Sequence, residues 1–416
     1  MHSSSSSPAR RDTLVSRTGV LYFPLALVAR LPFAMGVVGV LTLLVSVRGS
    51  VETAGLGSAM VGIASAIFGP LIGAAADRYG QRPTLLATAC VNSAAMGLLA
   101  WVAYSPLPSV VVFAAAFLVG ASIPQTSPMS RSRLVTIIKT ELPAERRPRT
   151  ISTVLAYESA ADEVVFVFGP VIVGLLATTL GAWAPIAGAA ALTLIFVTAF
   201  ALHHTSATAK SPEERAATLA PASQLARPSL LIVVLGIFAV GMVFGTTLTS
   251  LTAFMQARGA AESAGLFYGV MGVGSAILAI SVALFSPRFT LRYRWLVFAL
   301  FIVVGEAILA AAGSAGPEGG IGLVALGLAV TGIGIGPLLV TLYGFGSARS
   351  PEGRSATVMT MLGSGIMLGQ SLAAAAAGAV AESLGVAAAM MLPLCAGLVT
   401  VLAGLVNWLL TPPTAR

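Results

Sequence analysis

The sequence GAAADRYGQR, residues 73–82, is a short charged segment between two long apolar runs. Of the 416 residues in the chain, 57% are hydrophobic and only 9% are charged. Because soluble domains carry about 25% charged residues, no water-soluble fold of this length would bury so much apolar surface. We therefore predict an integral membrane protein, in which this segment is the turn where one membrane span ends and the next begins.

Twelve apolar stretches are long enough to cross a bilayer, which takes about 20 residues in a helix. They lack the alternating pattern of barrel strands, so we predict helices, the other structure that satisfies every backbone polar group in lipid. The predicted spans are 20–47, 54–76, 83–103, 107–127, 150–178, 183–203, 229–255, 262–285, 294–313, 320–345, 354–379 and 385–411.

Basic residues are divided unequally between the two sides of the predicted membrane. The side of the N-terminus holds 20 of the 23 Lys and Arg residues, the other side holds Arg48 and Arg258, and Arg30 lies within the first span. Because basic loops stay in the cytoplasm, we predict that both termini are cytoplasmic and that the chain lies in the inner (plasma) membrane. This orientation accounts for the net charge of +8, and we expect no nucleic-acid partner.

The spans fall into two groups of six, separated by the longest polar stretch between spans. Such a division is typical of transporters built from two parallel repeats. We predict a disordered terminus at 1–18, a six-helix bundle at 19–203, a central cytoplasmic loop at 204–228, a second six-helix bundle at 229–411 and a tail at 412–416. Cys90 and Cys395 both lie within spans, so we predict neither a disulfide nor a metal site.

The charged segment resembles the G-x-x-x-D-R-x-G-x-[RK] signature of the major facilitator superfamily, through Gly73, Asp77, Arg78, Gly80 and Arg82. The resemblance covers nearly the whole chain and implies an all-α membrane protein with twelve transmembrane helices in two six-helix bundles. It also implies a gate, in which Asp77 caps the N-terminus of span eleven and the two arginines add further contacts. The alternative is a plain cytosolic turn whose bases only obey membrane orientation.

The details suggest a drug/proton-antiporter-like exporter of the kind common in high-GC actinobacteria. The sequence FGPVIVG at 168–174 resembles the Gly-Pro motif that such antiporters carry in span five, with Gly169, Pro170 and Gly174 as helix-packing positions. One departure concerns span four, where these antiporters usually have an arginine. The predicted span has none, and prolines 124 and 128 interrupt its cytoplasmic end.

Five ionisable residues fall inside predicted spans, where each would cost about 2.5–3.5 kcal/mol if it faced lipid. They are Arg30, Glu158, Asp162, Glu163 and Glu306. We predict that Arg30 pairs with Asp162 or Glu163. The surplus of carboxylates in span five is typical of a proton-coupling site, and the alternative is that these acids only lock span five to span one. For Glu306 we predict a structural role or a polar neighbour.

Small residues suggest where spans two and eleven meet. Span two offers Gly62, Ser65, Gly69 and Gly73, and span eleven offers Gly363, Ser364, Gly365 and Gly369. Because small residues let helices approach closely in a membrane, we predict either a sliding contact or a static one between the two faces.

The candidates for the substrate cavity are Gln125, Thr246, Thr247 and Gln370, although the threonine hydroxyls alternatively bond to their own helix.

We predict a secondary active transporter that exports a small, amphipathic or hydrophobic molecule by alternating access and is driven by protons. It would act in the lipid bilayer as a monomer, without a cofactor. Two alternatives are a nutrient importer or facilitator of the same fold, and a membrane assembly or lipid-handling protein that transports nothing. No nucleotide-binding loop is present, so the sequence shows no means of hydrolysing ATP. We predict a transporter rather than an enzyme.

Overall fold

The computed structural model describes residues 13–49, 51–206, 212–259, 264–286, 288–314 and 320–411. All regular elements in these ranges are helical, and twelve helical spans are long and apolar enough to cross a membrane. The predicted fold class is therefore confirmed. Most span ends differ from the prediction by a few residues, and span four differs by much more.

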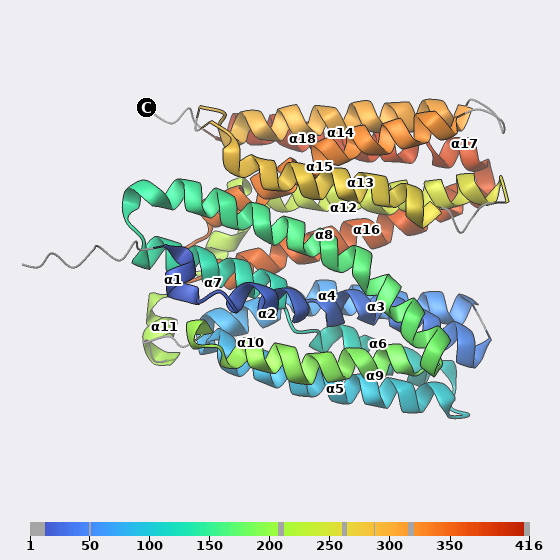
Figure 1. Cartoon of the computed structure of the whole chain (residues 1–416), viewed down its shortest axis with the longest axis horizontal. Helices are drawn as coiled ribbons and strands as arrows, with labels where there is room; N and C mark the ends of the chain where they lie inside the picture. The colour runs from blue at the N-terminus through green and yellow to red at the C-terminus, as the bar shows by residue number, and fades with distance from the viewer. Residues whose placement is uncertain are drawn as a thin grey trace, which may run out of the picture.

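Figure 1 shows the helices running side by side along the long axis of the molecule. The first bundle contains α2 (Tyr22–Val28), α3 (Leu31–Arg48), α4 (Val51–Tyr79), α5 (Gln81–Tyr104), α6 (Ser109–Ser122), α7 (Thr126–Glu141), α8 (Arg147–Leu180), α9 (Ala184–Leu192), the π-helix η2 (Thr193–Val197) and α10 (Thr198–Leu202). The second contains α12 (Pro228–Gln256), α13 (Ala264–Ser281), α14 (Leu291–Ser314), α15 (Ile321–Arg349), α16 (Ser355–Leu384), α17 (Val386–Ala389) and α18 (Leu392–Leu410).

Short helices lie at one end of the molecule, which we name the α11 end after α11 (Pro212–Thr218) (Figure 1). The same end carries α1 (Leu14–Thr18), and the predicted central loop also forms the 3-10 helices His204–Ser206 and Ala222–Ala226. Thr13 caps α1 in a capping box. The last residues of the predicted disordered terminus are therefore helical, whereas 1–12, Pro287 and 412–416 lie outside the described residues.

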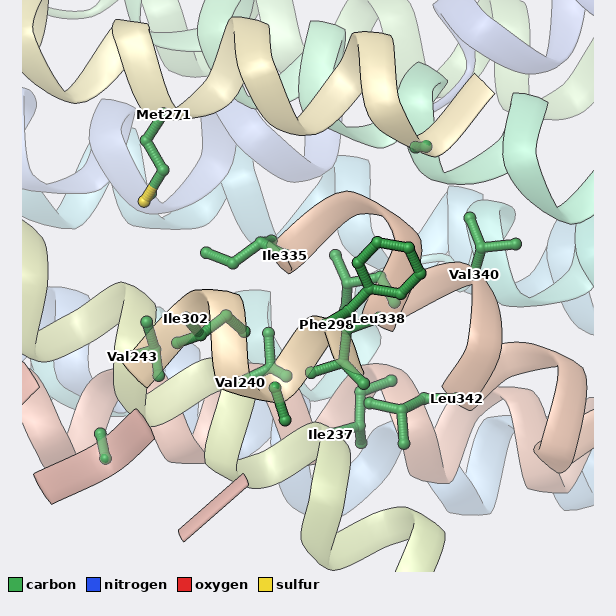
Figure 2. Packing of buried hydrophobic residues seen from close by; sticks show 14 of the residues in the cluster. Ile237, Val240, Val243, Met271, Phe298, Ile302, Ile335, Leu338, Val340 and Leu342 are labelled. Carbon is green, nitrogen blue, oxygen red and sulfur yellow. The ribbon is translucent and has the colours of Figure 1, made fainter. Parts of the chain in front are cut away.

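The second bundle is held together by interlocking apolar side chains on three of its helices (Figure 2). Lipid is as apolar as these side chains, so their contribution is close packing rather than removal from water. The buried set on α12, α14 and α15 includes Ile237, Val240, Val243, Phe298, Ile302, Ile335, Leu338 and Leu342.

Prolines interrupt two spans of the first bundle. Pro32 lacks the N–H that would bond to the carbonyl of Val28, so α2 ends there and Arg30 lies between α2 and α3. Pro124 separates α6 from α7 in the same way, but the chain then resumes as helix and continues to Glu141. The prediction that span four ends at 127 was therefore wrong. Its second half places Arg131 and Arg133, which we had expected in a loop, inside the bundle, where both are buried.

The turn in the charged segment is a single residue. Helix α4 ends at Tyr79 and α5 begins at Gln81, with Gly80 between them at a φ of 103°. Only glycine adopts such a conformation without strain. The sharp reversal keeps Asp77 close to the end of its helix.

Candidate functional site

Asp77 joins the two bundles at the α11 end. One carboxylate oxygen accepts a hydrogen bond from the N–H of Ala356 at 2.9 Å. The other accepts from the N–H of Thr357 at 2.7 Å and from its hydroxyl at 2.6 Å. These N–H groups lie in the first turn of α16, where they have no acceptor in their own helix and where the helix dipole favours a negative charge. Asp77 therefore caps α16 across the bundle interface.

Gly73 allows this approach one turn earlier on α4. A Cβ atom there would overlap the side chain of Thr360 and lie 2.9 Å from the carbonyl oxygen of Ala356. The two arginines of the segment contribute less than the resemblance implied. Arg78 lies over the ring of Tyr79 on its own helix, and Arg82 is exposed. Among the described residues, neither makes a hydrogen bond or an ion pair with α16.

Lys139 forms a second contact between the bundles at the α11 end. Its ammonium group, near the C-terminus of α7, donates to the carbonyl oxygen of Ser347 at 3.1 Å. Ser347 lies in the last turn of α15, where unpaired carbonyls and the helix dipole favour a positive charge. The contact thus complements that of Asp77, with a cation at a helix C-terminus. In the sequence, Lys139 was only one of the bases that indicated orientation.

Arg30 forms ion pairs with two acids of α8. Its Nη2 lies 2.6 Å from Glu158, and its Nη1 lies 3.1 Å from Asp162. Glu163, the other partner we considered, is not brought to Arg30. It lies about 100° further around the helix than Asp162 and accepts a hydrogen bond from Ser275 of α13, in the second bundle, at 2.9 Å.

Arg131 completes the cluster from α7. Its Nη2 lies 2.5 Å from Asp162, and its guanidinium stacks 3.8 Å from the ring centre of Tyr343 on α15. The interpretation that three acids face one base was therefore wrong, because Arg30 and Arg131 balance Glu158 and Asp162. The prediction that span four contains no arginine was also wrong, because this span continues through α7 and includes Arg131.

Hydroxyl groups satisfy the remaining oxygens of this charge cluster. Ser127 donates to both oxygens of Asp162, at 2.9 and 3.0 Å. Ser130 donates to Glu158 at 3.0 Å and also bonds to the hydroxyl of Tyr22 at 2.9 Å. A buried ion pair repays the cost of desolvation only when such extra hydrogen bonds are present. The proline break before α7 places both serines and Arg131 along α8.

A cavity of about 80 Å³ lies between the bundles beside the cluster. Asp162 is 23% exposed, whereas Arg30 and Arg131 are each 2% exposed, so Asp162 is the charged group most open to it. The volume suits a few water molecules and is well below the roughly 300 Å³ that a drug-sized ligand needs. Its walls include Arg30, Phe33, Gln125, Arg131, Asp162, Phe166, Tyr343, Ser364 and Met367.

The other predicted cavity residues do not line this space. Thr246 donates to the carbonyl oxygen of Met242 in its own helix at 2.8 Å. Thr247 donates to Glu306 at 3.0 Å, and that carboxylate is fully buried in the second bundle without a salt bridge among the described residues. The side chain of Gln370 makes no hydrogen bond within the described part of the chain.

The small residues of α16 divide between three neighbouring helices. Ser364 faces α4, where a Cβ on Gly69 would lie 2.6 Å from its hydroxyl oxygen. Positions 365 and 369 pack against α12 of the same bundle, and a Cβ on Gly363 would lie 3.6 Å from Pro128 of α7. The predicted meeting of spans two and eleven is therefore confirmed at Gly69 and Gly73, whereas Gly363, Gly365 and Gly369 contact other helices.

In the partial Gly-Pro motif on α8, Gly169 packs closely against a neighbouring helix. A Cβ on Gly169 would lie 2.7 Å from that of Ala34, so α3 and α8 approach closely there. Gly174 has no atom within 4 Å of such a Cβ, and its predicted packing role was wrong. Pro170 is within α8, but its side chain lies outside the described part.

Structural comparison relates this arrangement to known transporters. A bacterial homologue of the iron transporter ferroportin, in an outward-facing state, is 14% identical with a TM-score of 0.71, covering 93% of this chain and 99% of that one. The proton:xylose symporter XylE is 15% identical with a TM-score of 0.67, covering 95% and 96%. The human organic anion transporter MFSD10 is 16% identical with a TM-score of 0.66, covering 94% and 99%. At these identities the likeness shows the fold alone.

Sequence comparison shows the family. No curated protein matches the chain. The model of the Major Facilitator Superfamily, however, matches residues 22–374, which is most of its length. Together with the twelve spans, this match shows a multi-pass membrane protein of the transporter type, and the chain belongs to the major facilitator superfamily.

Proposed function

We propose that this transporter is a proton-coupled exporter of small amphipathic or hydrophobic molecules, with its α11 end in the cytoplasm. The orientation is supported by the excess of bases at that end. The basic loops remain in large excess there after the burial of Arg131 and Arg133 is taken into account.

The observation that carries the coupling proposal is the position of Glu163. Arg30 and Arg131 are both engaged by the other two acids of α8, so among the described residues no base forms an ion pair with Glu163. Its partner is the hydroxyl of Ser275, which belongs to the other bundle. A proton on Glu163 would remove a poorly compensated, half-buried charge, and movement of the bundles would break the hydrogen bond. Glu163 therefore links proton binding to the change of access.

The gate is proposed to be the pair of helix-end contacts made by Asp77 and Lys139. Both join the two bundles at the α11 end, so the inward-open state requires both to break. This is the expected behaviour of rigid bundles that rock about a central site.

The cargo is proposed to bind in an expanded form of the central cavity. Phe33, Phe166 and Met367 supply apolar contact there, and the ion pair of Arg131 and Asp162 supplies polar contact. Such a lining suits a molecule with one apolar face and one polar group.

Transport by the full chain in liposomes with an imposed pH gradient tests the proposal, with the amphipathic dye ethidium as the probe. We expect the gradient to accelerate dye movement by the wild type. We expect Glu163→Gln to lose this acceleration while it retains dye exchange without a gradient. Glu382→Gln is the matched control, because Glu382 is exposed near the end of α16. An undiminished response in Glu163→Gln would refute the coupling role, and dye movement in the opposite sense would refute export.

A further inference from the structure

A second cavity, of about 970 Å³, lies at the α11 end between the two bundles. Asp77 joins α4 to α16. This cavity lies elsewhere at the same end, between α8 and the segment that joins α13 to α14. Its walls include Lys139, Arg149, Ile151, Leu284, Phe289 and Arg294. It is therefore a space between the bundles that the protein's own side chains leave unfilled.

The charged groups around this cavity are mostly basic. Lys139 and Arg149 come from the first bundle and Arg294 from the second, whereas Glu145 is the acid in the lining. Like charges that face each other across an interface repel, and a bound anion would turn the repulsion into a bridge.

Arg294 is the most informative of these bases. It is only 8% exposed, and its Nε donates to the carbonyl oxygen of Phe289 at 2.6 Å. Its guanidinium lies near the rings of Phe285 and Phe289. Its two Nη groups make no hydrogen bond to any described residue, so a largely buried cation presents free donors in the wall of the cavity.

Apart from Ser152, Ser286, Thr290 and Ser347, the remaining wall is apolar, and at Leu284 it reaches the outer surface. Leu284 is 81% exposed at the end of a membrane span, a position that lipid covers. Ile151, Leu155 and Phe285 extend this surface into the cavity. A free phosphate would need only the bases, whereas a phospholipid would use the bases for its headgroup and the apolar wall for an acyl chain.

We propose that this cavity binds an anionic glycerophospholipid. The phosphate lies among Arg149, Lys139 and Arg294, and one acyl chain follows Leu284 and Phe285. Basic pockets between helices at the ends of membrane spans recognise such headgroups. The lipid would connect the two bundles at the interface that Asp77 does not reach, and would favour the closed α11 end.

Native mass spectrometry and thermal unfolding of the full chain in detergent test the proposal. The probes are phosphatidylglycerol, zwitterionic phosphatidylcholine and soluble glycerol 3-phosphate. We expect phosphatidylglycerol alone to remain bound and to raise the melting temperature. A hydrogen bond to a charged group contributes about 1.5–3 kcal/mol, so Arg149→Gln and Arg294→Gln should each weaken its binding by roughly tenfold or more.

The variants separate a lost site from a lost fold. Arg149 is exposed and its side chain makes no hydrogen bond within the described residues, so its replacement should leave unliganded stability unchanged. Arg227→Gln removes an exposed base at the same end and should bind the lipid like the wild type. Unchanged lipid binding in Arg149→Gln and Arg294→Gln would overturn the proposal. So would equal stabilisation by glycerol 3-phosphate, which indicates a soluble anion, or displacement of the lipid by ethidium, which indicates a vestibule for cargo.

Discussion

Arg131 shows how one side chain can determine the charge balance of a site. It reaches Asp162 from α7 and stacks on Tyr343 of the other bundle. Without it, Glu158 and Asp162 would share Arg30 as their base. With it, Glu158 and Asp162 are matched by two arginines, and Glu163 is set apart as the acid whose partner is a hydroxyl group.

Replacement of Arg131 by Gln should destabilise the protein, because it leaves Asp162, whose side chain is only 23% exposed, with Arg30 as its remaining base. Removal of one partner from a buried pair typically costs about 3–5 kcal/mol. The double variant Arg131→Gln/Asp162→Asn should lose much less than the sum of the two single losses, since it restores neutrality. Chemical or thermal unfolding in detergent measures this, with exposed Arg82→Gln as a control expected to stay within about 0.5 kcal/mol of the wild type. Simple additivity of the two losses would contradict the pairing.

At the scale of helices, the contact of α4 with α16 depends on the absence of side chains. Gly73→Ala should push α16 away from Asp77, because the new Cβ would overlap Thr360 and the backbone of α16. We expect loss of closure at the α11 end, measured as faster labelling of a cysteine placed at Ser364 in the cavity, after Cys90 and Cys395 have been replaced by alanine.

Gly174→Ala is the matched control for this contact. It makes the same change on α8, where a Cβ meets nothing within 4 Å. Its labelling rate should equal that of the parent, and its helix should gain up to about 1 kcal/mol from the better propensity of alanine. Equal labelling of the Gly73→Ala variant would show that α16 yields without opening the gate.

The helices themselves were largely predictable, because apolar length and turn residues determine where a chain can cross a bilayer. Span four failed for a physical reason. After Pro124 the sequence becomes polar, and hydropathy cannot distinguish a polar loop from a polar helix covered by a neighbouring one. Arg131 is buried because α8 and α15 supply Asp162 and Tyr343. Arg133 is buried because α5 and α10 supply Gln81 and Phe200, and only the folded arrangement brings these residues together. The cap made by Asp77 was expected, because its partner is a helix end rather than one particular side chain.

At the scale of the whole molecule, the two bundles are joined at the α11 end by contacts of opposite polarity. Asp77→Asn removes a charge from the N-terminus of α16, and Lys139→Gln removes one from the C-terminus of α15. Each should favour opening of the α11 end, by roughly 1–3 kcal/mol. The two contacts share no partner, so the effects should add in the double variant.

Labelling of the same cavity cysteine measures the opening, and transport assays should show turnover reduced more than affinity for the cargo. Loss of affinity with normal turnover would place Asp77 in the cargo site instead. A double variant no more open than either single one would show that the contacts act as one unit.

The balanced cluster of Arg30, Arg131, Glu158 and Asp162 also bears on the response to membrane voltage. Moving one elementary charge through the full potential is worth about 2.3 kcal/mol per 100 mV. Two positive and two negative groups that move together with one bundle transfer no net charge, so rocking of this bundle does no electrical work through the cluster. The charges near the centre of this bundle that remain to respond to the voltage are therefore those of Glu163, of its proton and of the cargo.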